Sequence, residues 1–326
     1  MKNVLVTGAG CPGFFATVQM LKSIPDLKVF SCDPNPSNSP GPTITESCFQ
    51  VPLGSNPHYI TTIQQIVKNN NIDIIIPLTD PELLPLASHD FGCDVWVSPP
   101  ESITILLDKL ALYKKTPRLA PAILELDAKG IQDYVHQHGS CFVKLHTGHG
   151  SRGTKKLIPK AQWLNLFSTA KPESYGSIFP VEDIQSIMDS NQVLFVENLP
   201  GEEYSVDCVF NKSDLIAYGV RNRALIKNGI CQNAVFERDP GEFHLAIKTL
   251  FQDIPVDHNI NVQLKRDSNR QLKLLEVNPR VSGSLDSFSP YGLNLLDISL
   301  RGYSSNLDLS CSIHGSTSYR VSSFIR

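Results

Sequence analysis

The sequence predicts an α/β fold in its N-terminal third and an α+β fold in the remainder. Strand and helix signals alternate regularly up to about residue 98. Beyond that point several strands follow one another, joined mostly by hairpin-type turns. Alternation is typical of a doubly wound parallel sheet, whereas successive strands are typical of antiparallel sheets. The length of 326 residues fits two domains.

The N-terminal third begins with a β-branched run that enters a glycine turn and then a helix. The unbroken apolar run at 74–78 favours a parallel strand covered on both faces. Thr79, Asp80 and Pro81 then predict the start of another helix. Residues 34–43, rich in Pro, Ser and Asn, predict a loop. The expected elements are strands at 3–7, 28–32 and 74–78, and helices at 14–23 and 59–69.

In the second part of the chain, Ser98 and two prolines form a break that opens a helix expected to run to Leu112. After this helix the alternation stops, and strand signals predominate. The sequence shows no internal repeat and no low-complexity tract. The expected strands lie at 141–145, 192–196, 204–210, 216–220, 259–265 and 271–277.

Composition excludes several classes of protein. A hydrophobic content of 41% is too high for a disordered chain. A net charge of −3 gives no electrostatic footprint for nucleic acid, and the apolar runs are too short for a membrane span. The eight cysteines form no CxxC pair, and the N-terminus has no hydrophobic leader segment. We therefore expect a reduced, cytoplasmic protein with free thiols and neither a nucleic-acid nor a membrane partner.

A glycine pattern near the N-terminus matches a dinucleotide fingerprint. Gly8, Gly10 and Gly13 follow a strand and open a helix, and Asp33 ends the next strand. The same turn also starts doubly wound domains that bind no nucleotide, and Pro12 removes one backbone N–H from the phosphate cradle. An NAD(P)-dependent oxidoreductase is thus one alternative, but it leaves most of the chain unexplained.

A lysine and a glycine-rich loop form the first of three segments that suggest nucleotide chemistry. Lys144 lies on an expected strand, and a loop through residue 153 follows it. Glycines allow the backbone to approach a polyphosphate closely, and lysine supplies positive charge. The alternative is a mobile surface hairpin. The candidate loop residues are Gly148, Gly150, Ser151 and Gly153.

The second segment is an acidic bend between two strands. A strand ends at Glu197, the chain turns at Pro200 and Gly201, and a strand resumes near Glu203. Such a bend can present backbone groups to an adenine edge, while a carboxylate accepts hydrogen bonds from ribose hydroxyls. The alternative is a hairpin with solvated acids.

The third segment is a hairpin around Ser268 and Asn269. A two-residue turn there would place Asn261 opposite Glu276 and Gln263 opposite Leu274. Four polar side chains would then share one sheet face, with a single carboxylate among amides. Oxygen ligands of this kind suit Mg²⁺. A polar outer face is the alternative, but it does not explain why Arg280 follows at once. The four residues are Asn261, Gln263, Glu276 and Asn278.

Taken in order, these segments resemble the ATP-grasp superfamily, most closely its carbamoyl-phosphate-synthase-like and amino-acid-ligase branches. The resemblance covers nearly the whole chain. It implies a doubly wound pre-ATP-grasp domain at 1–107 and an ATP-grasp domain of two α+β subdomains at 108–326, with a lid at about 115–195. Two residues depart from the pattern: Leu145 replaces a common proline, and Gln263 replaces an acid, as in the carbamoyl-phosphate-synthase-like branch.

The resemblance also implies an activity: an ATP- and Mg²⁺-dependent ligase, with Mn²⁺ as a substitute metal, that joins a small carboxylate to an amine through an acyl phosphate and releases ADP and phosphate. Alternatives are a carbamoyl-phosphate-type synthase and a catalytically silent ATP-binding protein. Relatives are often homodimers. The implied residues are Lys109 and Lys144 on the phosphates; Gly148, Gly150, Ser151 and Gly153 in the lid; Glu197, Asn198, Leu199 and Glu203 on the nucleoside; Gln263, Glu276 and Asn278 on the metal; and Arg280, with Arg223, on the transferring group.

Overall fold

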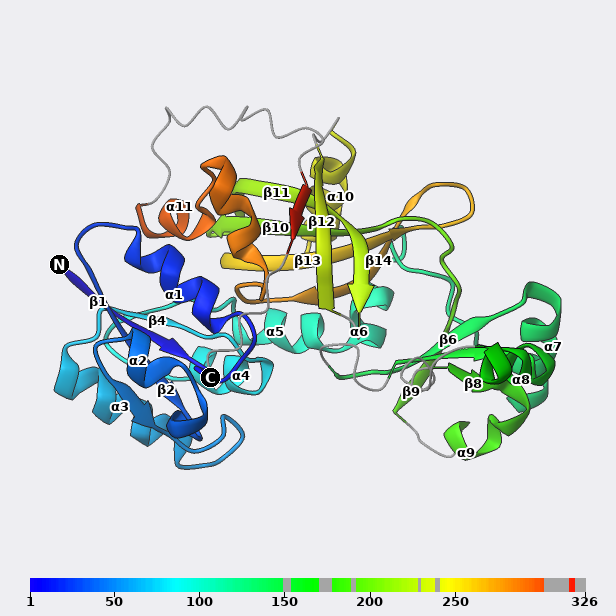
Figure 1. Cartoon of the computed structure of the whole chain (residues 1–326), viewed down its shortest axis with the longest axis horizontal. Coiled ribbons are helices and arrows are strands. Elements are labelled where there is room, and N and C mark those ends of the chain that lie inside the picture. The colour runs from blue at the N-terminus through cyan, green and yellow to red at the C-terminus, as the bar shows by residue number, and fades with distance from the viewer. Residues whose placement is uncertain are drawn as a thin grey trace.

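The computed structural model places three β-sheets in three regions of the molecule (Figure 1). A parallel sheet lies in the N-terminal region, a six-stranded sheet occupies the centre, and a four-stranded sheet forms a separate lobe. The residues that the structure describes are 1–148, 154–169, 178–188, 192–227, 230–237, 241–301 and 317–319. None of the helices within these ranges is long and apolar enough to cross a membrane.

The N-terminal sheet is parallel and has the strand order β3-β2-β1-β4-β5, which confirms the predicted doubly wound unit. Its strands are β1 (Lys2–Thr7), β2 (Leu27–Asp33), β3 (Cys48–Gln50), β4 (Ile74–Ile76) and β5 (Asp94–Val95). Its main helices are α1 (Phe14–Lys22), α3 (Tyr59–Asn70) and α4 (Asp80–Ala87). Thr79 caps α4 through a capping box with Glu82, as a helix start at this position requires.

Two predictions in this part of the chain were wrong. The expected loop at 34–43 contains two short helical turns, η1 (Pro36–Asn38) and α2 (Gly41–Ile44). The helix expected to reach Leu112 is two helices, α5 (Pro100–Leu107) and α6 (Lys109–Lys115). Asp108 separates them because its backbone is extended and its carboxylate accepts a hydrogen bond from the Ala111 amide at 2.9 Å. An Asp side chain that caps one helix ends the preceding one.

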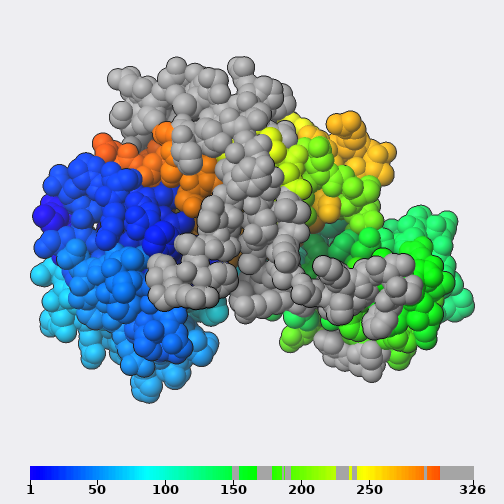
Figure 2. Space-filling model, in the orientation of Figure 1, coloured from blue at the N-terminus to red at the C-terminus, as the bar shows by residue number. Residues whose placement is uncertain are grey.

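The separate lobe contains a four-stranded sheet of order β8-β7-β6-β9 with the helices α7, α8 and α9 beside it (Figure 1). Figure 2 shows this lobe, in green, standing apart from the N-terminal region in blue. Its own core contains Val135, Val143, Leu157 and Phe195, all buried. A lobe with a core of its own can move as a unit relative to the rest of the chain. Its elements are α7 (Ala128–His138), β6 (Cys141–Leu145), β7 (Lys155–Ile158), α8 (Lys160–Thr169), β8 (Ile178–Pro180), α9 (Gln185–Met188) and β9 (Val193–Glu197).

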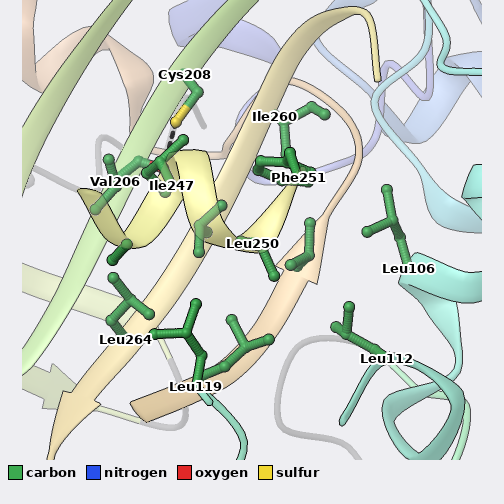
Figure 3. Close-up of a cluster of buried hydrophobic side chains, with 14 of the residues drawn as sticks. Leu106, Leu112, Leu119, Val206, Cys208, Ile247, Leu250, Phe251, Ile260 and Leu264 are labelled. Atoms are coloured by element: carbon green, nitrogen blue, oxygen red, sulfur yellow. Dashed lines mark hydrogen bonds between the residues drawn. The ribbon is translucent and has the colours of Figure 1, made fainter. Parts of the chain in front are cut away.

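The central sheet is antiparallel, with the order β14-β13-β10-β11-β12-β15. Alternate residues point to opposite faces, and one face is apolar. On that face Val206, Ile260 and Leu264 pack against Ile247 and Leu250 of the covering helix α10 (Figure 3). The elements are β10 (Glu203–Asn211), β11 (Asp214–Lys227), β12 (Ile230–Glu237), α10 (Glu242–Leu250), β13 (His258–Arg266), β14 (Leu272–Asn278), η4 (Leu285–Tyr291), α11 (Leu295–Arg301) and β15 (Thr317–Tyr319).

The other face of the central sheet has two parts. Near the N-terminal region it is apolar, and Val209 and Ala217 share a core with Phe14 and Val18 of α1 and with Phe288. Toward the separate lobe the same face becomes polar. A shared core fixes the N-terminal sheet against the central sheet, because separating them would expose this apolar surface. The polar part of the face is therefore held at a fixed distance from the N-terminal region.

Candidate active site

The polar part of the central sheet gathers side chains from four neighbouring strands. Ser205 on β10 lies opposite Arg221 on β11 and Gln263 on β13. Two residues further along β10, Asp207 lies opposite Gly219 on β11 and Asn261 on β13. Because the period of a strand is two, every second residue adds to this face. The full set is Glu203, Ser205, Asp207, Arg221, Arg223, Asn261, Gln263, Lys265, Glu276 and Asn278.

The predicted register of the β13–β14 hairpin was wrong, although the predicted face was right. Asn261 lies opposite Asn278, and Gln263 lies opposite Glu276. The turn is one residue longer than expected, because the Asp267 carboxylate accepts hydrogen bonds from two later amides and closes a wider loop. A bulge after Gln263 adds a second residue. One inserted residue would turn the side chains to the other face, but two restore it.

The candidate metal ligands lie together on the hairpin. The Asn278 side-chain amide is 3.3 Å from Glu276 Oε1, and Gln263 Oε1 accepts a hydrogen bond from Arg223 at 2.6 Å. One carboxylate and two amide oxygens suit a hard cation such as Mg²⁺. Within the described ranges no three His, Cys, Asp or Glu side chains gather as metal ligands.

Two lysines approach Glu276 from outside the central sheet. Lys109 begins α6, and its ammonium group lies 3.9 Å from the Glu276 carboxylate and donates to the Gly148 carbonyl at 2.7 Å. Lys144, on β6, donates to the Tyr113 hydroxyl at 3.2 Å, and that hydroxyl donates to the Leu275 carbonyl at 2.7 Å. The lobe and the central sheet are therefore joined through charged groups at this point.

Burial changes the acidity of one of these lysines. The pKa of Lys144 is lowered to about 8, chiefly because burial disfavours its charged form, although the nearby Glu276 carboxylate acts in the opposite direction. Above pH 8, a lysine with such a pKa gains a proton when a polyanion binds beside it. The pKa of the neighbouring Tyr113 hydroxyl is raised by burial, so it stays a neutral donor.

Arg280 connects the hairpin to the N-terminal region. Its Nε donates to the Asp80 carboxylate at 2.6 Å, across 200 residues of sequence. Its guanidinium also lies 3.4 Å from the Asn278 side-chain oxygen and 3.2 Å from the Val281 carbonyl. The side chain thus stands between the candidate metal ligands and the first turn of α4. A planar donor at this position can hold a carboxylate or a phosphoryl group.

The acidic bend is more constrained than the sequence suggested. Glu197 accepts a hydrogen bond from the Ala122 amide through its carboxylate, and its own amide donates to the Ala122 carbonyl. Leu199 is buried, and Asn198 is partly exposed. Glu203 pairs with Arg223 at 2.7 Å and with Lys265 at 3.7 Å. Adenine contacts from this bend would therefore come from Asn198 and Leu199.

Three of the predicted lid residues lie outside the described part of the chain, and two residues at the candidate site were not predicted. Gly150, Ser151 and Gly153 lie outside the described residues. From the sequence, Asp80 was expected only at the start of a helix, and Tyr113 was not predicted as a site residue. Tyr113 could have been found, because it lies four residues after Lys109 and so shares its helix face. Asp80 had no such signal, since its partner lies in another domain.

The glycine fingerprint forms hydrogen bonds and close packing contacts with other parts of the protein. The Gly10 amide donates to Asp33 at 2.7 Å, and the second oxygen of Asp33 accepts from the Asn35 amide at 2.8 Å. Gly13 packs against the backbone of Gly283, where an added Cβ would lie 2.5 Å from the Gly283 Cα. The turn therefore joins two parts of the chain, and its glycine provides close packing between backbones.

This architecture, with its polar sheet face between a doubly wound unit and a separate lobe, is that of the ATP-grasp proteins. A family model described as ATP-grasp in the biosynthetic pathway with Ter operon matches residues 189–323. A PylC-like N-terminal domain matches residues 4–93. These two matches confirm the predicted resemblance to the ATP-grasp superfamily, whereas the likeness of the N-terminal domain to PylC was not predicted. A search of curated proteins finds no match.

Solved structures support the same fold. N5-carboxyaminoimidazole synthetase from Staphylococcus aureus, complexed with ADP, has a TM-score of 0.66 at 15% identity, over 93% of this chain and 78% of that one. L-amino acid ligase from Bacillus licheniformis gives 0.65 at 12% identity, over 97% and 78%. The biotin carboxylase domain of Hydrogenobacter thermophilus 2-oxoglutarate carboxylase gives 0.66 at 12%, over 97% and 73%. At identities this low, the structural similarity shows a common fold and nothing more.

Proposed function

We propose that the protein is an ATP- and Mg²⁺-dependent ligase that joins a small carboxylate to an amine through an acyl phosphate. The observation that carries this proposal is the meeting of three groups at one place: Glu276 among amide oxygens, two lysines and Arg280. Phosphoryl transfer needs positioning and charge neutralisation more than covalent help, and these groups supply both. Solved relatives of the same fold contain ADP, or ADP with magnesium.

The position of each residue indicates its role in the proposed reaction. Lys109 and Lys144 contact phosphate oxygens, because both lie beside Glu276 at the junction with the lobe. Arg280 holds the substrate carboxylate and the transferring phosphoryl group, with Arg223 nearby. Gln263, Glu276 and Asn278 would hold Mg²⁺, which neutralises phosphate charge when bound.

The nucleoside lies at the bend between β9 and β10. Asn198 and Leu199 contact adenine through their backbone, and Glu203 holds the ribose. The lid includes Gly148, Gly150, Ser151 and Gly153, and it excludes water from the acyl phosphate, which hydrolyses readily. We place the lid subdomain at about 115–195, between a pre-ATP-grasp domain at 1–107 and the rest of the ATP-grasp domain, which ends at 326. The protein acts on small molecules in the cytoplasm, as a homodimer.

The test is the identity of the nucleotide product. The protein is incubated with ATP, Mg²⁺ and pools of amino acids, and the products are separated by chromatography. An acyl-phosphate ligase gives ADP and phosphate in amounts that depend on the added carboxylate and amine. Formation of AMP and pyrophosphate would refute the proposed mechanism, and ATP binding without turnover in any pool would favour the silent binding protein.

A further inference from the structure

Asp207 is buried within the polar sheet face and does not reach the candidate metal ligands. It is 2% exposed, and one of its carboxylate oxygens accepts a hydrogen bond from Arg221. The other oxygen, Oδ1, accepts from the Asn261 side-chain amide at 2.9 Å. Asn261 is also buried and lies beside Asn278. Asp207, Asn261 and Asn278 thus form a chain of buried groups that ends at the candidate metal site.

This series of hydrogen bonds has a direction, because a carboxylate can only accept hydrogen bonds. Asn261 must therefore turn its NH₂ group toward Asp207, where it also donates to the Ser205 hydroxyl at 2.7 Å. Its carbonyl oxygen then faces Asn278. The Asn278 NH₂ group lies 3.5 Å from that oxygen and 3.3 Å from Glu276 Oε1. Glu276 accepts from this NH₂ group and Arg280 donates to the Asn278 oxygen, so all three neighbours turn that oxygen toward the metal site.

We propose that Asp207 is a positioning residue that acts through Asn261 to fix which atom of the Asn278 amide faces the metal. This inference rests on the proposed function, because it takes Asn278 as a metal ligand. An amide binds a cation only through its oxygen, and the two ends of an amide have nearly the same shape. A residue that supports or opposes this orientation therefore changes how well Asn278 serves as a ligand. Groups beyond the ligands commonly tune metal affinity in this way.

We expect the substitution Asp207→Asn to reverse the direction of the hydrogen bond between residues 207 and 261. Arg221 can only donate, so the new amide must give its oxygen to Arg221 and its NH₂ group to Asn261. Asn261 then rotates to accept that hydrogen bond, and its NH₂ group faces Asn278. The NH₂ groups of Asn261 and Asn278 then oppose each other, which works against the orientation that Glu276 and Arg280 favour for Asn278. The change is nearly isosteric, so the site keeps its shape while Asn278 becomes a weaker ligand.

The double variant Asp207→Asn with Asn261→Asp should undo the reversal. Asn at 207 donates to the new carboxylate at 261, and that carboxylate can only accept from Asn278. The Asn278 oxygen then faces the metal again. The double variant has the same net charge as the original protein and keeps the weakened contact with Arg221. A merely structural role for the Asp207–Arg221 pair therefore predicts no rescue.

The measurement is calorimetric binding of adenylyl imidodiphosphate, an ATP analogue that is not hydrolysed at the γ-phosphate. The ratio of its dissociation constants in EDTA and in Mg²⁺ reports the contribution of the metal. Asp207→Asn should lower this ratio about tenfold or more, the size expected for a group that orients a metal ligand. The double variant should restore it to within about twofold. Affinity in EDTA should change little in both variants.

Asp33→Asn serves as the matched control, since Asp33 also holds amide hydrogens but lies on β2, outside this chain of groups. It should leave the ratio unchanged. An unchanged ratio in Asp207→Asn, or no recovery in the double variant, would overturn the proposal.

A second readout separates failure of this inference from failure of the proposed function. If the original protein does not bind the analogue, the ligase proposal fails. The side-chain amide resonances of Asn278 still report the relay, in protein labelled with ¹⁵N at asparagine. They should shift in Asp207→Asn and return in the double variant. Resonances that stay in place in the single variant would refute the relay without any ligand.

Discussion

The glycine turn at the N-terminus and the β13–β14 hairpin both carry polar groups to the end of a strand, yet they use those groups differently. In the turn, the Gly10 amide is bound to Asp33, and Gly13 is pressed against Gly283. In the hairpin, Glu276 and Asn278 face charged groups that come from other parts of the chain. A motif is therefore a stronger indication of function where its polar groups meet charged groups from several parts of the chain than where they bind a neighbouring turn.

The largest expected effect concerns the hairpin. Glu276→Ala removes the only carboxylate among the candidate metal ligands and the partner of Lys109. Turnover should fall by about a hundred- to a thousandfold, the loss typical of removing a group that stabilises charge in the transition state. Steady-state ADP release measures it, once an active substrate pool is found. The control is Glu101→Gln on the exposed start of α5. Activity that survives with unchanged Mg²⁺ dependence would exclude this metal site.

The next effect concerns the glycine turn. Gly13→Ala places a Cβ 2.5 Å from the Gly283 Cα, so two backbones must separate. We expect a loss of about 1–3 kcal/mol in the free energy of unfolding, as for other overpacked sites. Thermal and urea denaturation measure this loss.

The reciprocal variant is a matched control for this packing. A Cβ added at Gly283 would lie 3.8 Å from the Gly13 Cα, which is ordinary contact. Gly283→Ala should therefore cost clearly less than Gly13→Ala. Equal losses would show that the close approach of the two backbones does not limit stability.

The pH dependence of ATP binding tests the lysine beside the hairpin. Lys144 has a pKa of about 8 because it is buried, and a bound polyphosphate raises that pKa. Below pH 8 the lysine is already charged, so affinity is constant. Above pH 8 binding must take up a proton, and affinity should fall by up to about tenfold per pH unit.

Calorimetry in two buffers of different ionisation enthalpy measures the proton uptake at a pH of about 8.5. Lys144→Met should bind ATP weakly and should show no proton uptake at this pH. Proton uptake that persists in the variant would assign the pH dependence to another group.

The smallest effect concerns Asp33. Asp33→Asn weakens the hydrogen bonds to the Gly10 and Asn35 amides and should cost about 1 kcal/mol of stability. ATP affinity should stay within about twofold, because Asp33 lies outside the proposed nucleotide site. A thermal shift of the original protein with NADH, absent in this variant, would instead support the dinucleotide interpretation.

The fold was largely predictable, because it depends on short-range patterns. The alternating strands and helices before residue 98 predicted the parallel sheet, and β1, β2 and β4 confirm it. The helix expected to reach Leu112 was wrong because one side chain, Asp108, caps a new helix within an otherwise helical run. Propensity patterns average over several residues and do not detect a single cap.

The candidate site was predictable in its residue types but not in its contacts. The spacing of Gln263, Glu276 and Asn278 predicted a shared face, and the structure places them on one. The register was wrong because a longer turn and a bulge each add a residue, and only the folded hairpin shows that the two insertions compensate. The pairing of Arg280 with Asp80 spans 200 residues, so no local spacing could indicate it.

By itself, the sequence determined the periodicity of the strands, the alternation of apolar and polar faces, and the oxygen and nitrogen groups that Glu276, Lys144 and Arg280 bring. These depend on residue identity and on spacings of two to four positions, which the backbone geometry fixes. Only the tertiary structure decided that Lys144 is buried, that Gly13 meets Gly283 and that Asp207 accepts a hydrogen bond from Asn261. Burial, close packing and the direction of a hydrogen bond depend on neighbours distant in sequence, and these exist only once the chain has folded.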